Sequence, residues 1–354
     1  MSTSRNYDLV IYGAYGYTGR LITEVCKSKG ITALLSGRSE EQLQKLGKEF
    51  SFDSRAVSIE DAVALRKLVS EAKAVVHCAG PFAQTAKQMA SACLESSTHY
   101  LDITGEHEVF AYLHSLDGQA RQAGIMLMPG VGFDVVPTDC LAAHLKNRLP
   151  EATHLQLAFA GLPTGVSRGT ARTATQSFGK ESLVRINGTL QSVGKKPKTT
   201  VIDYGEKKLN SVCISWGDIV TAWHTTGIPN IEVYMAASPG LVNSIRFALR
   251  WGWFFQWGPV KRFILKKINQ RPAGPSEEVL GTGKTLVFGK AWRGDKSVES
   301  RLVTTNGYRL TADMAVIIAE KVVKGNFKTG FSTPAACYGP DLVLEAPRIN
   351  RYDA

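Results

Sequence analysis

The first residues that can do chemistry form a glycine-rich string, which follows an apolar run near the start of the chain. Glycines at such a place permit a tight turn and let backbone amides approach a pyrophosphate, while the start of a following helix adds partial positive charge. The spacing is Gly-x-x-Gly-x-x-Gly rather than the more common Gly-x-Gly-x-x-Gly, so the string alone is a weak signal. We predict that a dinucleotide binds at this string, which comprises Gly13, Ala14, Tyr15, Gly16, Tyr17, Thr18 and Gly19.

A second candidate group follows 25 residues after Gly13, where recognition of the adenosine ribose is expected. An NAD site uses a carboxylate there to accept a hydrogen bond from the ribose 2′-hydroxyl. The chain instead has Gly37, Arg38 and Ser39, with no acidic residue before Glu40. A guanidinium can stack on adenine and pair with a 2′-phosphate, and the serine hydroxyl can donate to the same group. The sequence therefore predicts NADP rather than NAD.

These candidates need a scaffold that brings several strand ends to one edge, and the first 150 residues have the pattern of one. Short β-rich runs alternate with helical stretches, which is typical of a parallel sheet with helices on both faces. Directly after the first strand of such a domain, the glycine string becomes a strong indication. The expected strands are residues 8–12, 32–36, 55–58, 74–78, 99–103 and 125–128, and the expected helices are 18–29, 40–49, 61–70, 85–96, 109–123 and 137–149.

The pattern changes from residue 154 onward, where strand candidates outnumber helices. This mixture predicts a largely antiparallel sheet in a second domain. A long helix over 311–324 then ends at Gly325. The predicted fold class is α/β, a doubly wound Rossmann sheet with a second α/β domain, whose expected strands include 155–160, 212–216, 231–235, 286–292 and 298–304.

The remaining strand ends of the first domain offer candidates for catalysis, because ligands of such sheets bind at the carboxyl ends of the strands. Hydride transfer needs one proton donor and a dry, oriented pocket. A carboxylate at a strand–helix junction often caps a helix instead, and a histidine there is often a surface or core residue, so both interpretations stay open. We take Tyr100, Glu106 and Asp134 as the catalytic candidates, with Asp102 and His107 also considered.

The strand-end motifs together resemble the saccharopine dehydrogenase-like superfamily, in particular the branch with trans-acting enoyl reductases and saccharopine dehydrogenase-like oxidoreductases. They occur in order over nearly the whole chain. One departure is Ser58, where many relatives have Asp, and this weakens an adenine contact at that position. The motifs are Gly-Ala-x-Gly-x-Thr-Gly at 13–19, Ser-Gly-Arg at 36–38, Ala-Gly-Pro-Phe at 79–82, His-Tyr-x-Asp-x-Thr-Gly-Glu at 99–106, Gly-Phe-Asp-x-x-Pro-x-Asp at 132–139 and Thr-Pro-Ala at 333–335.

The resemblance implies how the chain is divided and where the cofactor contacts it. Residues 1–150, completed by 308–354, would form the NADP-binding Rossmann domain, and 151–307 an inserted substrate or dimerisation domain. NADP(H) would lie over the glycine string, with 79–82 near the nicotinamide ribose and residues 133 and 134 beside the nicotinamide. The further cofactor contacts expected are Cys78, Ala79, Gly80, Pro81, Phe82, Gly132, Phe133 and Asp134.

Composition and charge exclude several classes of protein. The chain has 354 residues, of which 44% are hydrophobic and 21% charged, as in a globular protein of about two domains. Its net charge of +11 is confined to the second half, so nucleic acid is not expected as a partner. The six cysteines never approach zinc-ligand spacing, and no metal is expected. A polar start without a signal peptide and reduced thiols predict a cytoplasmic protein.

A basic aromatic segment, residues 246–271, combines seven basic side chains with no acidic one. Three of the six tryptophans of the chain lie in one seven-residue stretch of this segment. Such a composition suits a helix that lies on an anionic membrane or at the mouth of a lipid-substrate site. The alternative is a helix pair whose aromatics, Phe263 among them, pack into the second domain or a homodimer. Both alternatives are open, and we expect a homodimer with peripheral membrane contact.

These observations predict an NADPH-dependent oxidoreductase that reduces a C=C or C=N bond of an apolar acyl or polyketide-like substrate. One alternative is a saccharopine-type reductase of amino-acid metabolism, which needs several arginines around a dicarboxylate substrate. Arg168, Arg172 and Arg185 are the candidates for that role. The other alternative is a non-catalytic NADP(H)-binding protein at a lipid surface.

Overall fold

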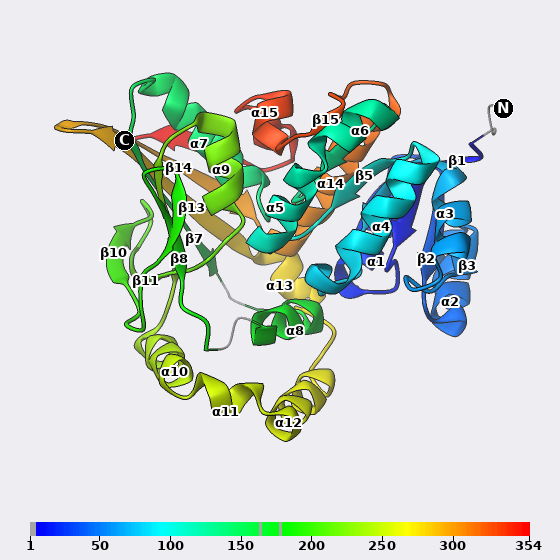
Figure 1. Ribbon diagram of the computed structural model, residues 1–354, viewed down its shortest axis with the longest axis horizontal. Helices are drawn as coiled ribbons and strands as arrows, with labels where there is room; N and C mark the ends of the chain where they lie inside the picture. The colour runs from blue at the N-terminus through cyan, green and yellow to red at the C-terminus, as the bar shows by residue number, and fades with distance from the viewer. Residues whose placement is uncertain (1–4, 163–164, 177–178) are drawn as a thin grey trace. The chain divides into compact units, whose positions relative to one another are not determined.

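The structure is a computed structural model and describes residues 5–162, 165–176 and 179–354. It contains two compact units (Figure 1). Unit 1 comprises Met1–Val136 and Tyr308–Ala346, and unit 2 comprises Pro137–Gly307 and Pro347–Ala354.

Unit 1 is built on a seven-stranded sheet in which every pair of neighbouring strands is parallel. The strand order is β15-β6-β5-β4-β1-β2-β3, so the chain leaves β1 toward one edge and returns beside β1 to build the other. This reversal is the switch point at which doubly wound sheets bind dinucleotides. The strands are β1 (Tyr7–Tyr12), β2 (Ala33–Gly37), β3 (Ser54–Ala56), β4 (Ala72–His77), β5 (His99–Asp102), β6 (Met126–Met128) and β15 (Gly330–Phe331).

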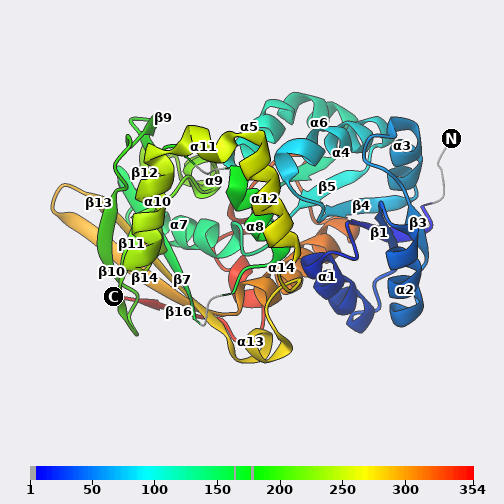
Figure 2. The same ribbon diagram turned by 90° about the horizontal axis from the view of Figure 1, so that it is seen from below.

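Helices cover both faces of this sheet, which confirms the predicted fold class. Val10 and Val75 point into a core formed with side chains of α3 to α6, among them Met89 and Leu113. Figure 2 shows α1, α2 and α14 on the opposite side of the sheet. The helices are α1 (Tyr17–Ser28), α2 (Glu40–Phe50), α3 (Ala62–Ser70), α4 (Phe82–Ser96), α5 (His107–Ser115), α6 (Asp117–Ala123), α14 (Gly307–Val323) and α15 (Pro334–Tyr338), with a short 3₁₀ helix, η1 (Leu342–Glu345).

Unit 2 contains a nine-stranded, mostly antiparallel sheet, as predicted. Its main path is β10-β11-β12-β7-β13-β14-β16, in which only β12 and β7 are parallel. A long hairpin of β13 and β14 pairs Lys284 with Thr305 at one end and Arg293 with Lys296 at the turn. The strands are β7 (His154–Leu162), β8 (Leu183–Ile186), β9 (Thr189–Ser192), β10 (Thr199–Asp203), β11 (Lys208–Cys213), β12 (Asn230–Ala236), β13 (Lys284–Arg293), β14 (Lys296–Thr305) and β16 (Asn350–Asp353).

Two segments group differently from the boundaries expected at residues 150 and 308. Helix α7, expected at the end of the first domain, groups with unit 2, and Gly289 explains its close approach to β13: a Cβ there would lie 2.7 Å from Leu145. The C-terminal strand β16 pairs with β14, so residues 347–354 also lie in unit 2. The helices of unit 2 are α7 (Val136–Arg148), α8 (Arg168–Gln176), α9 (Asp218–Thr226), α10 (Pro239–Arg250), α11 (Gly252–Gln256), α12 (Gly258–Asn269) and α13 (Glu277–Thr282).

Across the part of the chain that the structure describes, no helix is both long enough and apolar enough to cross a membrane. The six cysteines are free thiols, and four of them are buried. Burial raises the pKa of Cys26 to about 12, so this thiol stays protonated and packs as a small apolar side chain.

Candidate functional site

The glycine string forms a tight loop between β1 and α1 at the switch point of the sheet. Gly13 has a φ of +85°, and a Cβ at this position would lie 2.9 Å from Ala79. A Cβ on Gly19 would lie 2.4 Å from the carbonyl oxygen of Gly13, so α1 starts directly against the loop. That helix has no side-chain cap and no acidic residue in its first turn. A loop so close to a helix start is a cradle that fits a pyrophosphate.

The end of β2 lies beside this loop. The hydroxyl of Tyr15 accepts a hydrogen bond from the backbone amide of Arg38 at 3.1 Å. The Tyr15 ring also covers Gly37, where a Cβ would approach it to 2.6 Å. Only glycine therefore permits the ring to hold the end of β2 against the glycine loop.

The polar groups after β2 include two of the kinds that bind a 2′-phosphate, a guanidinium and a hydroxyl. The Arg38 side chain is exposed. The Ser39 hydroxyl caps α2 by accepting from the amide of Gln42 at 3.4 Å, which leaves its own hydrogen for donation. The nearest carboxylate, Glu40, accepts from the side chain of Gln44 at 2.9 Å and the amide of Ala56 at 3.3 Å. A cation, a hydroxyl donor and an occupied carboxylate fit NADP better than NAD.

The segment after β4 is held by hydrogen bonds to the loop that follows β5. The Glu106 carboxylate accepts from the backbone amides of Phe82 at 2.9 Å and Ala83 at 2.8 Å. Pro81, the residue at the cap position of α4, makes no side-chain cap, and the Glu106 carboxylate takes over this role from outside the helix. A capping carboxylate was expected to cap the helix that follows it, which is α5 for Glu106. The structure shows it capping α4 instead. This contact ties residues 79–82 to the β5 loop.

Two further residues steady the end of β4. The amide of Cys78 donates to the carbonyl of Tyr12 at 2.7 Å, so this position remains tied to β1. Thr85 donates its hydroxyl to the carbonyl of Ala79 at 2.8 Å, and its oxygen lies 2.9 Å from Nε2 of the buried His77. Burial lowers the pKa of His77 to about 3, so the imidazole is neutral. Sequence reasoning did not assign a role to this histidine.

Tyr100 and Asp102 form a fully buried pair on β5. The tyrosine hydroxyl donates to Oδ2 of Asp102 at 2.6 Å, and Oδ1 accepts from the amides of Thr104 at 3.0 Å and Gly130 at 2.9 Å. Burial raises the pKa of Asp102 to about 6, although these hydrogen bonds act in the opposite direction. Burial also raises the pKa of Tyr100. The pair therefore joins β5 to the loop after β6, and the tyrosine hydroxyl is buried with Asp102 as its hydrogen-bond partner.

The loop after β6 contains the last group of expected contacts. Its Gly132 lies against Thr311 of α14, where a Cβ would come within 2.5 Å, and the amide of Phe133 donates to the Thr311 hydroxyl at 2.9 Å. Asp134 is half-buried, and a Cβ on Gly105 would lie 2.9 Å from its Oδ2. Thr311 was missed because it lies 178 residues from its partner in the sequence.

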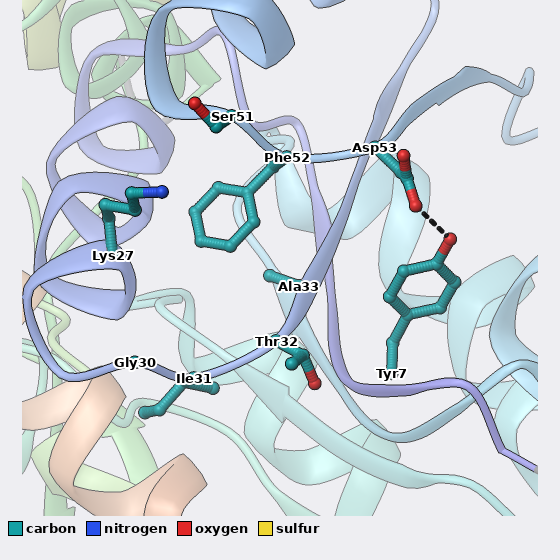
Figure 3. Close-up of a pocket in the computed structure, with 9 residues that line it drawn as sticks. All are labelled: Tyr7, Lys27, Gly30, Ile31, Thr32, Ala33, Ser51, Phe52 and Asp53. Atoms are coloured by element: carbon teal, nitrogen blue, oxygen red, sulfur yellow. Dashed lines mark hydrogen bonds between the residues drawn. The ribbon is translucent and has the colours of Figure 1, made fainter.

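The carboxyl edge of the sheet therefore brings together the loops that contain residues 13–18, 37–39, 78–82 and 132–134, while Tyr100 is buried behind them. A pocket of about 350 Å³ lies elsewhere in unit 1, at the amino ends of β1 and β2 (Figure 3). Tyr7 there donates to Asp53 at 2.6 Å, and this bond helps raise the tyrosine pKa to about 12. The pocket contains none of the predicted site residues.

The three arginines considered for a dicarboxylate substrate bind protein groups within unit 2. Arg172 donates to Oδ1 of Asn269 at 3.0 Å through Nε, and Arg168 to the Asn269 carbonyl at 3.4 Å. Arg185 is buried, donates to the carbonyl of Ile219 at 2.8 Å and lies 5.1 Å from the ring of Trp223.

The strand order and the glycine loop define unit 1 as a dinucleotide-binding domain of the Rossmann class. More particularly, residues 9–128 match the family model of the saccharopine dehydrogenase NADP binding domain. This confirms the expected cofactor class, NADP, and the resemblance on which it was based.

Three relatives are similar over part of the chain. A saccharopine dehydrogenase-like oxidoreductase of Mus musculus is 27% identical over 206 residues, which are 51% of this chain and 48% of the relative. A lipid droplet localized protein of Caenorhabditis elegans is 27% identical over 240 residues, 59% and 56% of the two chains. A trans-acting enoyl reductase of Mycobacterium bovis is 31% identical over 159 residues, 42% and 37%. The chain spans about half the length of the first of these.

One solved structure is similar over the whole chain. Apo saccharopine dehydrogenase (L-Glu forming) of Saccharomyces cerevisiae aligns with a TM-score of 0.68 and covers 98% of this chain and 100% of its own. The identity is 11%, so this likeness shows a shared fold and nothing about the substrate.

Proposed function

We propose that this chain is an NADPH-dependent oxidoreductase that reduces the C=C bond of an enoyl group, or a C=N bond, in an apolar acyl or polyketide-like substrate. The observation that carries the cofactor half of this proposal is the exposed Arg38 beside Tyr15 and the glycine loop, with Glu40 occupied by other donors. NADPH supplies a hydride when it is bound. The residues of the chain hold its phosphates, orient its nicotinamide ribose and deliver a proton.

The phosphates would lie on the loop of Gly13 and Gly16 and the start of α1, and the 2′-phosphate would pair with Arg38 and Ser39. Residues 78–82 would contact the nicotinamide ribose, held in place by the carboxylate of Glu106. Gly132 and Phe133 would lie beside the nicotinamide, fixed by Thr311. In this assignment Glu106 is a positioning residue, because its carboxylate is used by the amides of α4.

Asp134 is the candidate that best suits a proton donor. It is half-buried on the loop after β6, whereas Tyr100 is fully buried and bonded to Asp102. Enoyl reduction needs a hydride at the β-carbon, which bound NADPH would supply, and a proton at the α-carbon, which the carboxyl group of Asp134 would supply. In reduction of a C=N bond, the hydride adds to carbon and the proton to nitrogen. The group must then recover its proton from solvent.

Support for an apolar substrate comes from two relatives. One is named a trans-acting enoyl reductase and the other a lipid droplet localized protein. A saccharopine-type reaction remains the second candidate, on the shared fold alone. Arg168, Arg172 and Arg185 bind protein groups within unit 2, which disfavours their use for a dicarboxylate substrate.

A test is to follow the hydride itself. NADPH deuterated at the transferring position is mixed with the protein and a long-chain trans-2-enoyl thioester, and mass spectrometry locates the label in the product. One deuterium at the β-carbon is expected. Label in the secondary amine formed from an amino acid and a 2-oxo acid would instead support the saccharopine-type reaction. NADPH binding without reduction of either acceptor would contradict a reductase and favour the non-catalytic protein.

The matched variant for this test is Asp134→Asn, which removes the proposed proton donor and keeps the shape of the side chain. Its rate of enoyl reduction should fall at least tenfold, with NADPH affinity within about threefold of the unchanged protein. An unchanged rate would remove Asp134 from the mechanism while leaving the hydride-transfer result to stand on its own.

A further inference from the structure

Helices α10, α11 and α12 carry an unusual share of the exposed apolar side chains of the molecule. Among the described residues, fourteen large apolar side chains are exposed, and seven of them lie between positions 241 and 263. Trp253 is 70% exposed, and Trp257 and Phe263 are each 60% exposed. We call this the basic aromatic surface, and its apolar members are Leu241, Phe247, Trp251, Trp253, Phe254, Trp257 and Phe263.

The alternative that these aromatics pack into unit 2 disagrees with their exposure. No residue of α10 is buried, and Ile268 is the one buried side chain among those described in α11 and α12. Phe263, one of the aromatic side chains that this alternative packs into the second domain, is exposed instead. The rings lie near one another, with centroids 6.4 Å apart for Trp251 and Trp253 and 6.1 Å apart for Trp253 and Phe254. They form an aromatic group at the surface rather than part of the core.

The same surface is positively charged. Its basic members include Arg262, Lys266 and Lys267, whose side chains are exposed, and Nζ of Lys267 lies 5.8 Å from the ring of Phe263. Residues 246–271 contain seven basic and no acidic residues. The structure describes the side chains of six of these basic residues, and none of the six takes part in an ion pair within the described part of the molecule. The charge is therefore available to an external anionic partner.

These helices are attached to the rest of unit 2 at two points, so the surface has a defined place in the fold. Gly179 lies against Gly252, where a Cβ would come within 2.4 Å of the Gly252 Cα atom. At the other end, Asn269 of α12 accepts a hydrogen bond from Arg172 of α8 at 3.0 Å. Figure 1 shows α10, α11 and α12 following one another along the chain.

We infer that the basic aromatic surface docks unit 2 on an anionic lipid surface. The indole and phenyl rings would enter the boundary between headgroups and acyl chains, and the lysine and arginine side chains would contact anionic headgroups. Charge complementarity favours this partner over a second copy of the chain, because two such faces would bring like charges together. The inference concerns binding and does not depend on which bond the enzyme reduces.

The test is co-sedimentation of the full chain with vesicles, comparing pure phosphatidylcholine with phosphatidylcholine mixed with phosphatidylserine. We expect retention on the anionic vesicles only, weakening as the salt concentration rises. The double variant Trp253→Ala with Trp257→Ala should lower the vesicle affinity at least tenfold, and tryptophan fluorescence of the unchanged protein should shift to the blue on binding. NADPH affinity should remain unchanged and serves as the check that the variant is folded.

A charge-matched pair of variants separates local from overall electrostatics. Lys266→Glu with Lys267→Glu should lower affinity for anionic vesicles about tenfold or more, since each basic residue near the surface contributes roughly a fivefold effect. Lys195→Glu with Lys196→Glu changes the net charge equally at exposed positions of another loop and should have a much smaller effect.

Equal losses in the two charge variants would overturn the inference, as would absence of retention on either vesicle. Sedimentation velocity of the same proteins tests whether a second copy of the chain covers this surface. A dimer that becomes a monomer in the tryptophan double variant, without vesicle binding by the unchanged protein, would mean that a second copy covers this surface.

Discussion

The carboxylate of Glu106 accepts a hydrogen bond from the backbone amide of Phe82 at 2.9 Å. It thereby fixes the start of α4 from the loop that follows β5. Its second oxygen accepts from Ala83 at 2.8 Å. A negative charge at a helix start also interacts favourably with the helix dipole. One side chain therefore stabilises unit 1 and holds the segment proposed to contact the nicotinamide ribose.

Glu106→Ala should lower the free energy of unfolding by about 1–2 kcal/mol, as the loss of a helix cap does, and should weaken NADPH binding. Chemical denaturation and calorimetric titration measure the two effects. The matched control is Glu108→Ala, an exposed carboxylate two residues away, which should change NADPH affinity little. Equal effects of the two substitutions would mean that the α4 contact has no special role.

Gly19→Ala should disturb the cofactor loop by steric contact alone, because Gly19 has an ordinary helical backbone and its Cβ would lie 2.4 Å from the Gly13 oxygen. We expect a loss of about 1–3 kcal/mol in stability and a clear loss of NADPH affinity. Gly118→Ala is the control, since Gly118 lies in α6 with no atom within 4 Å of the added Cβ. That variant should be as stable as the unchanged protein or more so.

The buried Asp102 predicts a pH dependence of stability with a definite sign. Its pKa is about 6 in the folded protein and 3.8 as the ordinary value, so the folded state binds the proton more tightly. This contribution stabilises the fold at low pH and is lost as the pH rises through about 6. His77 acts in the opposite direction: its pKa falls from 6.5 to about 3, and its contribution is lost on acidification.

Asp102→Asn removes the contribution of Asp102 to the pH dependence of stability and leaves that of His77. The variant should therefore lose more stability than the unchanged protein between pH 6 and pH 4, by about 2 kcal/mol. Urea denaturation at a series of pH values measures the difference. Parallel stability curves would show that Asp102 does not titrate in this range.

Sequence patterns predicted six of the seven strands of unit 1, because their signals are local. The short strand β15 was not predicted, and the one helix expected over 109–123 is divided into α5 and α6. The glycine string, the first two strands and Arg38 all lie within about thirty residues of one another along the chain. The grouping of α7 with unit 2 depends on residues far apart in the chain. Gly289 in β13 leaves room for Leu145 of α7. Such a contact leaves no periodic signal near either residue.

The same reason explains what was missed at the site. Glu106 was predicted as a catalytic candidate or a cap of its own helix, and its partners on α4 are fixed only by the order of β4 and β5 in the sheet. Thr311 supports Phe133 from the far end of the chain. Tyr100 lies on β5, all of whose residues are buried, and its hydroxyl is bonded to Asp102, an arrangement that the sequence pattern did not predict.

The most direct test of the account compares NADPH and NADH binding to the unchanged protein and to Arg38→Ala by isothermal titration calorimetry. We predict that the unchanged protein binds NADPH much more tightly than NADH. The substitution should weaken NADPH binding by about ten- to a hundredfold, as expected for lost charge-assisted hydrogen bonds to a phosphate, and leave NADH affinity nearly unchanged. Comparable losses for both cofactors, or a preference of the unchanged protein for NADH, would contradict the assignment of Arg38 to the 2′-phosphate.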